Sequence, residues 1–290
     1  MTPMEIFSLL SHKLPMRKES ANKGDFGKLS VVAGSERYRG AASLAVNAAL
    51  RCGVGLVRLV STEPVIAAVA ATRPECTFFL LAAARNGGIS QTDFLKHLSE
   101  LSSSDAILVG CGMTVSSDTE AIVSALSEIG CPLVIDADGL NALRYAPERL
   151  KGAVITPHVG EMARLTGLPI LEIQSDREKI ARRFSQDYGC VTVLKDSVTA
   201  VASPDGDFFV WERENSGLAK GGSGDVLAGV IASLLAQGLS SYDAAVCGVV
   251  LHGLAAGKAR ERLGAEAMLP TDVIASLSTV YQDLRKESLS

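Results

Sequence analysis

The sequence lacks the patterns that mark several large classes of protein. Its 28 basic and 32 acidic residues give a net charge of −4, without the basic stripe typical of nucleic-acid-binding proteins. No segment reaches the roughly 20 consecutive apolar residues that span a bilayer. The first apolar run is interrupted by polar residues and Lys13, unlike a signal peptide. We therefore expect a cytoplasmic protein with no nucleic-acid or membrane partner.

Cysteine is present but unpatterned. The six cysteines form no C-x-x-C pair and show no Cys/His spacing of the kind that binds zinc. A disulfide framework is not expected in a chain of this length. We expect all six to act as small buried hydrophobic residues: Cys52, Cys76, Cys111, Cys131, Cys190 and Cys247.

Short β-branched runs alternate with longer helical patterns along most of the chain. Strands are predicted at residues 29–33, 56–60, 77–81, 106–109, 133–136, 153–156 and 191–194, and helices at 41–52, 63–71, 92–101, 117–129, 160–166 and 172–188. Nearly continuous apolar strands separated by helices are typical of a parallel sheet covered on both faces. Residues 199–202 and 208–211 predict a hairpin, followed by helices at 226–236, 242–262 and 271–286. Without a linker or repeat, we predict one domain over residues 1–290.

The most informative segment is N-S-G-L-A-K-G-G-S-G-D at residues 215–225, which leads into an apolar helical pattern. Its four glycines let the backbone curl with amides facing inward. A helix that follows such a loop offers unpaired amides and a positive dipole end to an anion. A carboxylate is a poor phosphate ligand, so Asp225 at this position suggests a base for a hydroxyl and hence phosphoryl transfer. Asp also favours helix starts for purely structural reasons, and the loop alone leaves both readings open.

Polar residues follow five predicted strands, in loops at residues 34–42, 110–114, 136–143, 156–161 and 195–199. In a parallel sheet the ligand crevice lies at the carboxyl ends of the strands. Asp136 and Asp138 have the spacing to hold a hydrated metal ion, or to cap a helix. His158 and Glu161 are predicted to face the crevice. Lys195 either meets nucleotide phosphates or is a solvated surface residue.

Taken together, these motifs resemble the ribokinase-like superfamily, and within it the ADP/ATP-dependent NAD(P)H-hydrate dehydratases. The resemblance runs from about Lys23 to about Lys258, and its most specific parts are K-G-D-x-G, D-A-D-G-L-N-A-L, T-P-H-x-G-E and G-G-x-G-D-V-L-A-G. Sugar kinases share the last G-x-G-D but usually have Asn in place of His158. The resemblance implies an α/β fold, a three-layer α/β/α sandwich with a mostly parallel central sheet, a C-terminal β-hairpin and helices.

The same resemblance implies a function, the dehydration of (S)-NAD(P)H-hydrate to NAD(P)H by transient phosphorylation of the ring hydroxyl. The co-substrate would be ADP, favoured over ATP, with Mg²⁺ placed through water by Glu161. Asp225 would be the base, and the amides of Gly222, Ser223 and Gly224 would hold the transferring phosphoryl group. Substrate contacts would come from Ala41, Gly112, His158 and Asp225. Nucleotide contacts would come from Lys195, Asp196, Ser197, Val198, Thr199, Asn215 and Gly224.

Several positions depart from the family pattern. Asn22 replaces the usual His of H-K-G, G-C-G-M-T at residues 110–114 replaces G-P-G-L-G, and Asp196 replaces the Gly of L-K-G. Lys220 replaces Thr, and either adds charge at the phosphates or points to solvent. With about 28 residues before the first strand, we expect no epimerase domain, and the resemblance implies a separate epimerase as partner and a homotetramer.

Two other functions stay open at this point. One is a superfamily kinase of a small vitamin-precursor alcohol, such as a thiazole or pyrimidine alcohol, which would leave a stable phosphorylated product. The other is a catalytically silent nucleotide sensor, which would bind ADP without turning over hydrated NADH.

Overall fold

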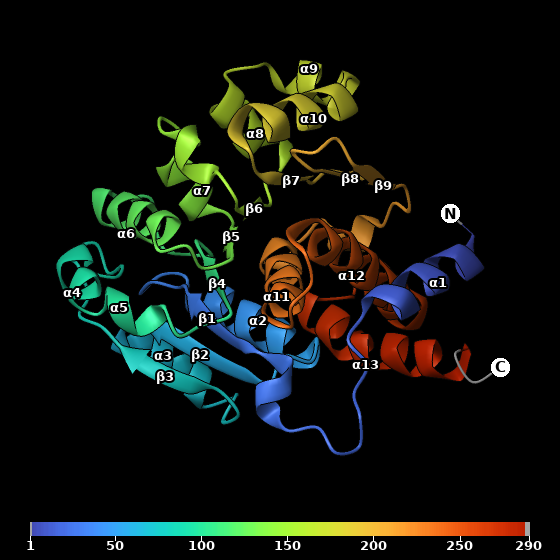
Figure 1. The fold of residues 1–290 in the computed structure, drawn as a ribbon, viewed down its shortest axis with the longest axis horizontal. Coiled ribbons are helices and arrows are strands. Elements are labelled where there is room, and N and C mark those ends of the chain that lie inside the picture. Colours follow the sequence, from blue (N-terminus) through green and yellow to red (C-terminus); the bar gives the residue numbers. More distant parts are fainter. Residues whose placement is uncertain (1, 288–290) are drawn as a thin grey trace.

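A single nine-stranded sheet forms the centre of the computed structural model, which describes residues 2–287 (Figure 1). Its strand order is β3-β2-β1-β4-β5-β6-β7-β8-β9. The first seven strands pair in parallel, and β8 and β9 add an antiparallel hairpin at one edge. The strands are β1 (Lys28–Val32), β2 (Leu56–Ser61), β3 (Thr77–Leu80), β4 (Ala106–Val109), β5 (Leu133–Ile135), β6 (Val154–Ile155), β7 (Val191–Leu194), β8 (Thr199–Ala202) and β9 (Phe208–Trp211).

Helices cover both faces of the sheet, because alternate residues of the buried strands point to opposite sides. Val31 and Leu108 belong to one hydrophobic core, and Val32 and Val109 belong to the other. The first core is closed by α1 (Pro3–Lys13), α2 (Arg39–Arg51), α3 (Glu63–Ala70), α11 (Ser223–Ala236), α12 (Ser241–Leu263) and α13 (Pro270–Glu287). The second is closed by α4 (Gln91–Lys96), α5 (Leu98–Leu101), α6 (Ser117–Glu128), α7 (Asp138–Ala142), α8 (Val159–Thr166), α9 (Ile170–Ser175) and α10 (Arg177–Tyr188). The predicted three-layer arrangement is confirmed.

Three short 3₁₀ helices complete the elements: η1 (Lys23–Phe26), η2 (Pro147–Leu150) and η3 (Ser216–Leu218). The structure corrects two predicted helices. The one expected at residues 92–101 is interrupted at His97, and the one expected at 172–188 begins two residues earlier and is interrupted at Asp176, whose backbone leaves the helical region at φ −130° and ψ 44°. Helices α1 and α7 were not predicted. Helix α7 has only 5 residues, whereas α1 has 11 and carries sequence signals that were overlooked, a capping box at Thr2 and a proline at its start.

Helix α11 is held deep in the first layer, and this placement fixes its N-terminus at the crevice. Every residue from Val226 to Ala236 is buried. At Gly229 the backbones of α11 and α2 approach closely, since an added Cβ would lie 2.4 Å from the carbonyl oxygen of Ala45. The first turn of α11 is thereby set beside the carboxyl ends of the parallel strands, where ligands bind in open α/β sheets.

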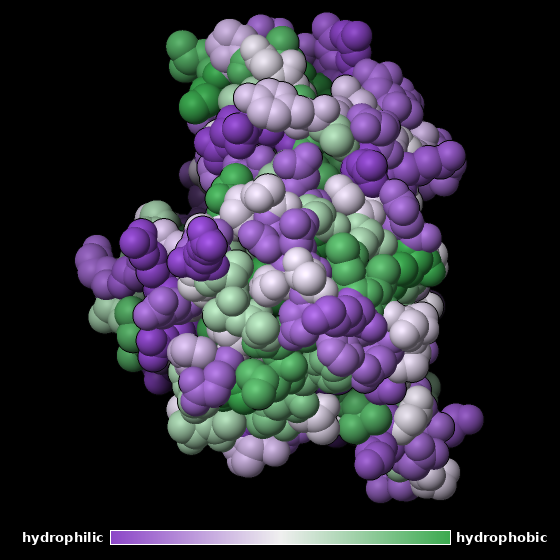
Figure 2. All heavy atoms as spheres, turned by 90° about the vertical axis from the view of Figure 1, so that its left-hand side faces the viewer, coloured by the Kyte–Doolittle hydropathy of each residue, from purple (hydrophilic) through white to green (hydrophobic). Residues whose placement is uncertain are grey.

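The helices in the described part of the chain include no candidate for a membrane span. None of the helices there combines the length and apolar character needed to cross a bilayer. Hydrophilic and hydrophobic residues are intermingled over the face seen in Figure 2.

Candidate functional site

The glycine loop ends in an open helix N-terminus. Gly222, with φ 99°, occupies the N-cap position of α11, and no side chain among the described residues caps this end. The left-handed backbone at Gly222 favours glycine. The N–H of Ser223 donates to the carbonyl of Lys220 over 3.3 Å, whereas those of Gly222 and Gly224 make no main-chain hydrogen bond within residues 2–287. The segment therefore presents donors to a ligand.

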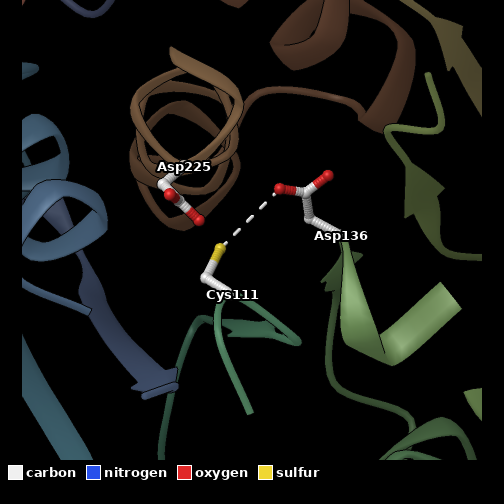
Figure 3. Close-up of side chains that lie close together, drawn as sticks. All are labelled: Cys111, Asp136 and Asp225. Atoms are coloured by element: carbon white, nitrogen blue, oxygen red, sulfur yellow. Dashed lines mark hydrogen bonds between the residues drawn. The ribbon is translucent and has the colours of Figure 1, made fainter. Parts of the chain in front are cut away.

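Asp225 lies in the first turn of α11, close to two groups from neighbouring strand ends (Figure 3). One is Asp136, which follows β5 and is 1% exposed, and the other is Cys111, which follows β4 and is fully buried. One ligand atom from each of the three side chains lies within 4.8 Å of the other two. The thiol of Cys111 donates to Oδ2 of Asp136 over 3.8 Å. Three groups that are distant in sequence thus converge at one point.

The pKa of Asp225 is raised to about 6, first by burial and then by the negative charge of Asp136, while the Cys111 thiol and Lys195 oppose the shift. A helix N-terminus alone favours the ionised form, but here burial and the neighbouring carboxylate outweigh it. Asp225 is consequently ionised near neutral pH yet more basic than an exposed aspartate, which suits a general base.

Lys195 connects this carboxylate cluster to the glycine loop. Its Nζ donates to Oδ1 of Asp136 over 2.8 Å, and the hydroxyl of Thr156 donates to the same oxygen over 2.6 Å. A Cβ added to Gly224 would lie 3.2 Å from Nζ. Burial lowers the pKa of Lys195, but the charges of Asp136 and Glu161 overcome this effect and hold the pKa above its usual value. The alternative that Lys195 is a solvated surface residue is wrong.

His158 and Glu161 close the N-terminus of α8 between them. Nδ1 of His158 accepts hydrogen bonds from the N–H groups of Gly160 (3.0 Å) and Glu161 (3.3 Å), and Oε2 of Glu161 accepts from the N–H of His158 (2.9 Å). Because Nδ1 is an acceptor, the neutral imidazole carries its proton on Nε2, 3.5 Å from Oε1 of Glu161. Burial and the charges of Lys195 and Arg164 lower the pKa of His158. His158 therefore has a structural role, and its side chain stays half-exposed.

Glu161 is the second carboxylate of the site with a raised pKa. Its side chain is almost fully buried, and burial together with Asp136 raises its pKa to about 7 against the opposing charge of Lys195. Asp138, which starts α7, accepts from the N–H of Thr114 over 2.9 Å, and burial raises its pKa as well. Three carboxylates thus lie near Lys195, those of Asp136, Glu161 and Asp225, and they are hard oxygen donors of the kind that suits Mg²⁺.

Two buried polar atoms near the glycine loop have no partner among the described residues. Asn215 caps η3 by accepting from the N–H of Gly217 over 3.0 Å, but its Nδ2 is unpaired. The hydroxyl of Ser223 is also buried and unpaired. Unsatisfied buried polar groups are uncommon and call for an explanation. A polar ligand at this loop would give both atoms a partner.

The remaining predicted nucleotide residues belong to the turn between β7 and β8. Asp196 receives hydrogen bonds from Arg177 (2.8 Å) and Gln174 (3.2 Å). Burial acts to raise the pKa of Asp196, but the hydrogen bonds from Ser197, Gln174 and Arg177 prevail and lower it. Ser197 is exposed, Val198 is half-buried, and Thr199 begins β8. Their contacts with a nucleotide stay a prediction.

The predicted substrate residues Ala41, in the first turn of α2, and Gly112, in the loop after β4, lie side by side. A Cβ added to Gly112 would fall 2.8 Å from that of Ala41 and 2.7 Å from that of Tyr38. The hydroxyl of Ser35 donates to the carbonyl of Gly112 over 2.8 Å. Two non-glycine residues nearby have positive φ angles: Thr114, in the loop after β4 (69°), and Ala137, between β5 and α7 (47°). Such strained non-glycine positions cluster at functional sites.

Lys220 does not simply point to solvent, and its contribution of charge at the phosphates stays a prediction. Its Nζ donates to the carbonyl of Glu266 over 2.5 Å and ties the glycine loop to the connection between α12 and α13. In the loop after β1, Arg39 donates to the carbonyl of Glu36 over 3.0 Å, and Arg37 is exposed.

Sequence reasoning missed three residues of the site. Thr156 was considered only as part of a motif. Cys111 was considered only as a hydrophobic residue; Cys111 is buried as expected, but beside two carboxylates. His252 is buried on α12 close to the main chain of Ser223, and burial with the charge of Lys195 lowers its pKa to about 4. Its Nε2 has no partner in the described chain. A polar residue within the apolar pattern of α12 is the signal that would have identified it.

Comparison with known proteins agrees with this geometry. Residues 29–279 match the family model described as NAD(P)H-hydrate dehydratase. The chain is 38% identical to the bifunctional NAD(P)H-hydrate repair enzyme Nnr of Escherichia coli, over 93% of this chain and 50% of that protein. It is 37% identical to the ADP-dependent (S)-NAD(P)H-hydrate dehydratase of Neisseria meningitidis, over 91% of this chain and 88% of that protein. It thus spans about half the length of the bifunctional relatives.

Solved structures give the same result. The Bacillus subtilis ADP/ATP-dependent NAD(P)H-hydrate dehydratase, co-crystallized with ATP and Mg²⁺, aligns with a TM-score of 0.81 and 27% identity. The alignment covers 98% of this chain and 97% of that one. Likeness to structures of the ribokinase-like superfamily confirms the predicted fold.

Proposed function

This chain belongs to the NAD(P)H-hydrate dehydratase family, and we propose that it restores NAD(P)H from the (S)-hydrate by phosphoryl transfer from ADP, in preference to ATP. The observation that carries the proposal is the position of Asp225, whose pKa is about 6, in the first turn of an uncapped helix. Nζ of Lys195 lies close to Gly224, which belongs to the same turn of α11 as Asp225. A base, a set of open amides and a fixed cation are the parts that phosphoryl transfer needs.

The reaction has to replace a poor leaving group. Hydroxide leaves the hydrated ring reluctantly, whereas phosphate leaves readily. In the proposed reaction, the hydroxyl oxygen of the hydrated ring attacks the terminal phosphorus of ADP and AMP is released. Asp225 accepts the proton of that hydroxyl during the attack. The ring nitrogen then donates its electron pair as the carbon–oxygen bond breaks and phosphate departs, and loss of a proton from the adjacent carbon restores the double bond.

The protein's contribution is alignment and charge stabilisation. The amides of Gly222, Ser223 and Gly224 would hold the equatorial oxygens of the moving phosphoryl group, with Ser223 turning its N–H away from the carbonyl of Lys220. Each such donor contributes on the order of 10²–10³-fold to turnover in acyl-transfer enzymes. Lys195 supplies a fixed positive charge beside Asp136. Ala41, Gly112 and His158 would contact the hydrated ring.

The carboxylate set also suits a divalent cation. Asp136, Glu161 and Asp225 lie near the ammonium group of Lys195, and all three offer the oxygen ligands that Mg²⁺ prefers. Glu161 would hold the ion through water. When bound, Mg²⁺ would neutralise the charge of the nucleotide phosphates.

We further propose the cellular context that the family suggests. The protein would be a cytoplasmic homotetramer and would depend on an epimerase activity, because relatives that it resembles are named for the (S)-hydrate alone. Light scattering coupled to gel filtration tests the tetramer, and a mass of one or two chains would contradict it.

The function is tested by incubating the purified chain with (S)-NADH-hydrate, Mg²⁺ and either ADP or ATP. We expect the absorbance of reduced nicotinamide to recover, with one phosphate and, from ADP, one AMP formed per NADH. A phosphorylated hydrate that accumulates, or nucleotide binding without recovery of NADH, would contradict the proposal. A faster reaction with ATP than with ADP would overturn the preferred donor alone.

A further inference from the structure

The cluster of Cys111, Asp136 and Asp225 contains a thiol that phosphoryl transfer does not use. It is the one group of three or more His, Cys, Asp or Glu side chains within residues 2–287 whose ligand atoms converge closely enough to hold a metal ion. We propose that these three side chains form a binding site for a thiophilic divalent cation such as Zn²⁺, separate in its ligand set from any Mg²⁺ that the nucleotide brings. Bound there, the cation would immobilise Asp225.

The distances between the ligand atoms suit such an ion. Zinc lies about 2.0–2.3 Å from oxygen and sulfur ligands in tetrahedral sites, so its ligand atoms are separated by roughly 3.3–3.8 Å. Sγ of Cys111 and Oδ2 of Asp136 are already 3.8 Å apart. All three ligand atoms lie within 4.8 Å of one another. The two remaining distances, both to Asp225, are at most 4.8 Å, so a small rotation of that side chain would complete the triangle.

Asp136 is divided between two roles, which leaves one of its oxygens for the cation. Its Oδ1 accepts from both Lys195 and Thr156, whereas its Oδ2 faces the thiol of Cys111. The ammonium of Lys195 thus occupies the opposite side of the carboxylate. With a thiolate and two carboxylates as ligands, the three negative charges would be balanced by Lys195 and one divalent ion.

The main chain holds the thiol in place. Cys111 lies between Gly110 and Gly112, whose φ angles of 118° and 63° curve the turn after β4. The turn is pressed onto Asp136, since a Cβ added to Gly110 would lie 2.0 Å from the carbonyl oxygen of Asp136. The carbonyl of Cys111 accepts from the N–H of Gly34 over 2.8 Å. Two of the three ligands are therefore fixed before the ion arrives.

Asp225 provides the entrance. Cys111 and Asp136 are fully buried, while Asp225 and the three residues before it are half-buried and Gly221 is exposed. An ion would reach the thiol from the crevice, past Asp225, and exchange the thiol proton for the metal. Soft thiolate ligands select Zn²⁺, Cd²⁺ or Co²⁺ over Mg²⁺.

The test uses Co²⁺ as a spectroscopic probe, titrated into the full chain in excess Mg²⁺ so that oxygen-only sites are filled. We expect a thiolate-to-cobalt charge-transfer band in the near ultraviolet that saturates at one ion per chain. Cys111→Ser should abolish the band and weaken Co²⁺ binding by at least about 10-fold, the loss seen even for outer-shell partners of metals. No band in the wild-type chain, or a band that survives in Cys111→Ser, would overturn the proposal.

Matched variants separate the site from general effects. Cys247→Ser removes another buried thiol, and Asp138→Asn removes a nearby carboxylate outside the ligand set; both should keep the band. Asp225→Asn should weaken Co²⁺ binding at least about 10-fold with the band reduced, and it decides the matter if Cys111→Ser fails to fold. Unchanged affinity in Asp225→Asn would refute the site. If the band appears in a protein that has no dehydratase activity, the proposed function fails and the metal site stands.

Discussion

Two helices, α8 and α11, begin beside Lys195, and among the described residues side chains cap the N-terminus of the first but not of the second. The first turn of α8 is closed by its own side chains, with His158 and Glu161 satisfying each other's main-chain N–H groups. The first turn of α11 starts from a left-handed glycine, and no described side chain caps it. Both ends carry the same dipole. The main-chain N–H groups of the first turn are thus satisfied by side chains at α8, whereas at α11 they have no side-chain cap from residues 2–287 and could meet an anion.

The largest expected effect comes from removing the carboxylate at the open end. Asp225→Asn should lower turnover by about 10²–10⁴-fold, the usual contribution of a general base, while ADP still binds. Initial rates of NADH recovery measure the first expectation and calorimetric titration with ADP measures the second. Asp138→Asn is the control, because that side chain bonds to the N–H of Thr114 and is not assigned to the proton transfer. Near-normal turnover in Asp225→Asn would disprove the assignment of the base.

The next largest effect is that of Asp225→Asn on the free energy of unfolding. The folded pKa of Asp225 is about 6, above the value of about 4 expected in the unfolded chain. The folded protein therefore binds this proton more tightly than the unfolded chain does. The stability that protonated Asp225 contributes is fully present below pH ~4 and is lost as pH rises through about 6. Asp225→Asn should thus raise the free energy of unfolding at pH 8 by up to about 3 kcal/mol, at 1.4 kcal/mol per pKa unit. At pH 4 the two proteins should be equal.

Urea unfolding at the two pH values checks this expectation. If Asp225→Asn is less stable than the wild type at pH 8, then ionised Asp225 stabilises the fold. That result would contradict the prediction that burying this charge lowers the free energy of unfolding.

A smaller effect is expected at the glycine that starts α11. Gly222→Ala places a side chain at φ 99°, which costs roughly 1–2 kcal/mol, and should reduce turnover by distorting the amides beside it. Gly221→Ala is the matched control, since a Cβ there meets nothing within 4 Å and its φ is not positive. Thermal unfolding and turnover of both variants make the comparison. Equal losses in the two would contradict a special role for the left-handed position.

The smallest effect is expected at the closed end. His158→Ala removes the cap of α8 and should cost about 0.5–2 kcal/mol, whereas His158→Asn should restore most of that stability with a different cap. The Michaelis constant for the hydrate distinguishes the two roles of His158. If His158→Asn restores stability but not substrate affinity, the ring contacts substrate as predicted; if it restores both, the residue is only a cap.

Much of the fold could be predicted because its strands are short apolar runs bounded by glycine, proline or aspartate. The limits of β4, β7, β8 and β9 agree with the prediction to the residue. Helices were harder where local signals are short: His97 and Asp176 interrupt apolar patterns that continue on both sides of them. Nothing in a helical period shows that such a break occurs.

The site was predictable as a set of loops but not as a set of contacts. Residues after parallel strands share one edge, so Asp136, His158 and Lys195 could be placed together from the sequence. The ion pair of Lys195 with Asp136, 59 residues apart, depends on side-chain directions that only the packed structure fixes. The same is true of Cys111, whose burial was expected but whose two carboxylate neighbours were not.

The pH dependence of kcat/KM tests most directly whether the carboxylate at the open end of α11 is the base. With hydrated NADH, ADP and Mg²⁺, we expect kcat/KM to fall below an apparent pKa of about 6, because protonated Asp225 cannot accept the hydroxyl proton. Glu161→Gln should keep this limb, although Glu161 itself has a pKa of about 7. A profile that stays flat down to pH ~4.5, or a limb that disappears in Glu161→Gln, would contradict the account.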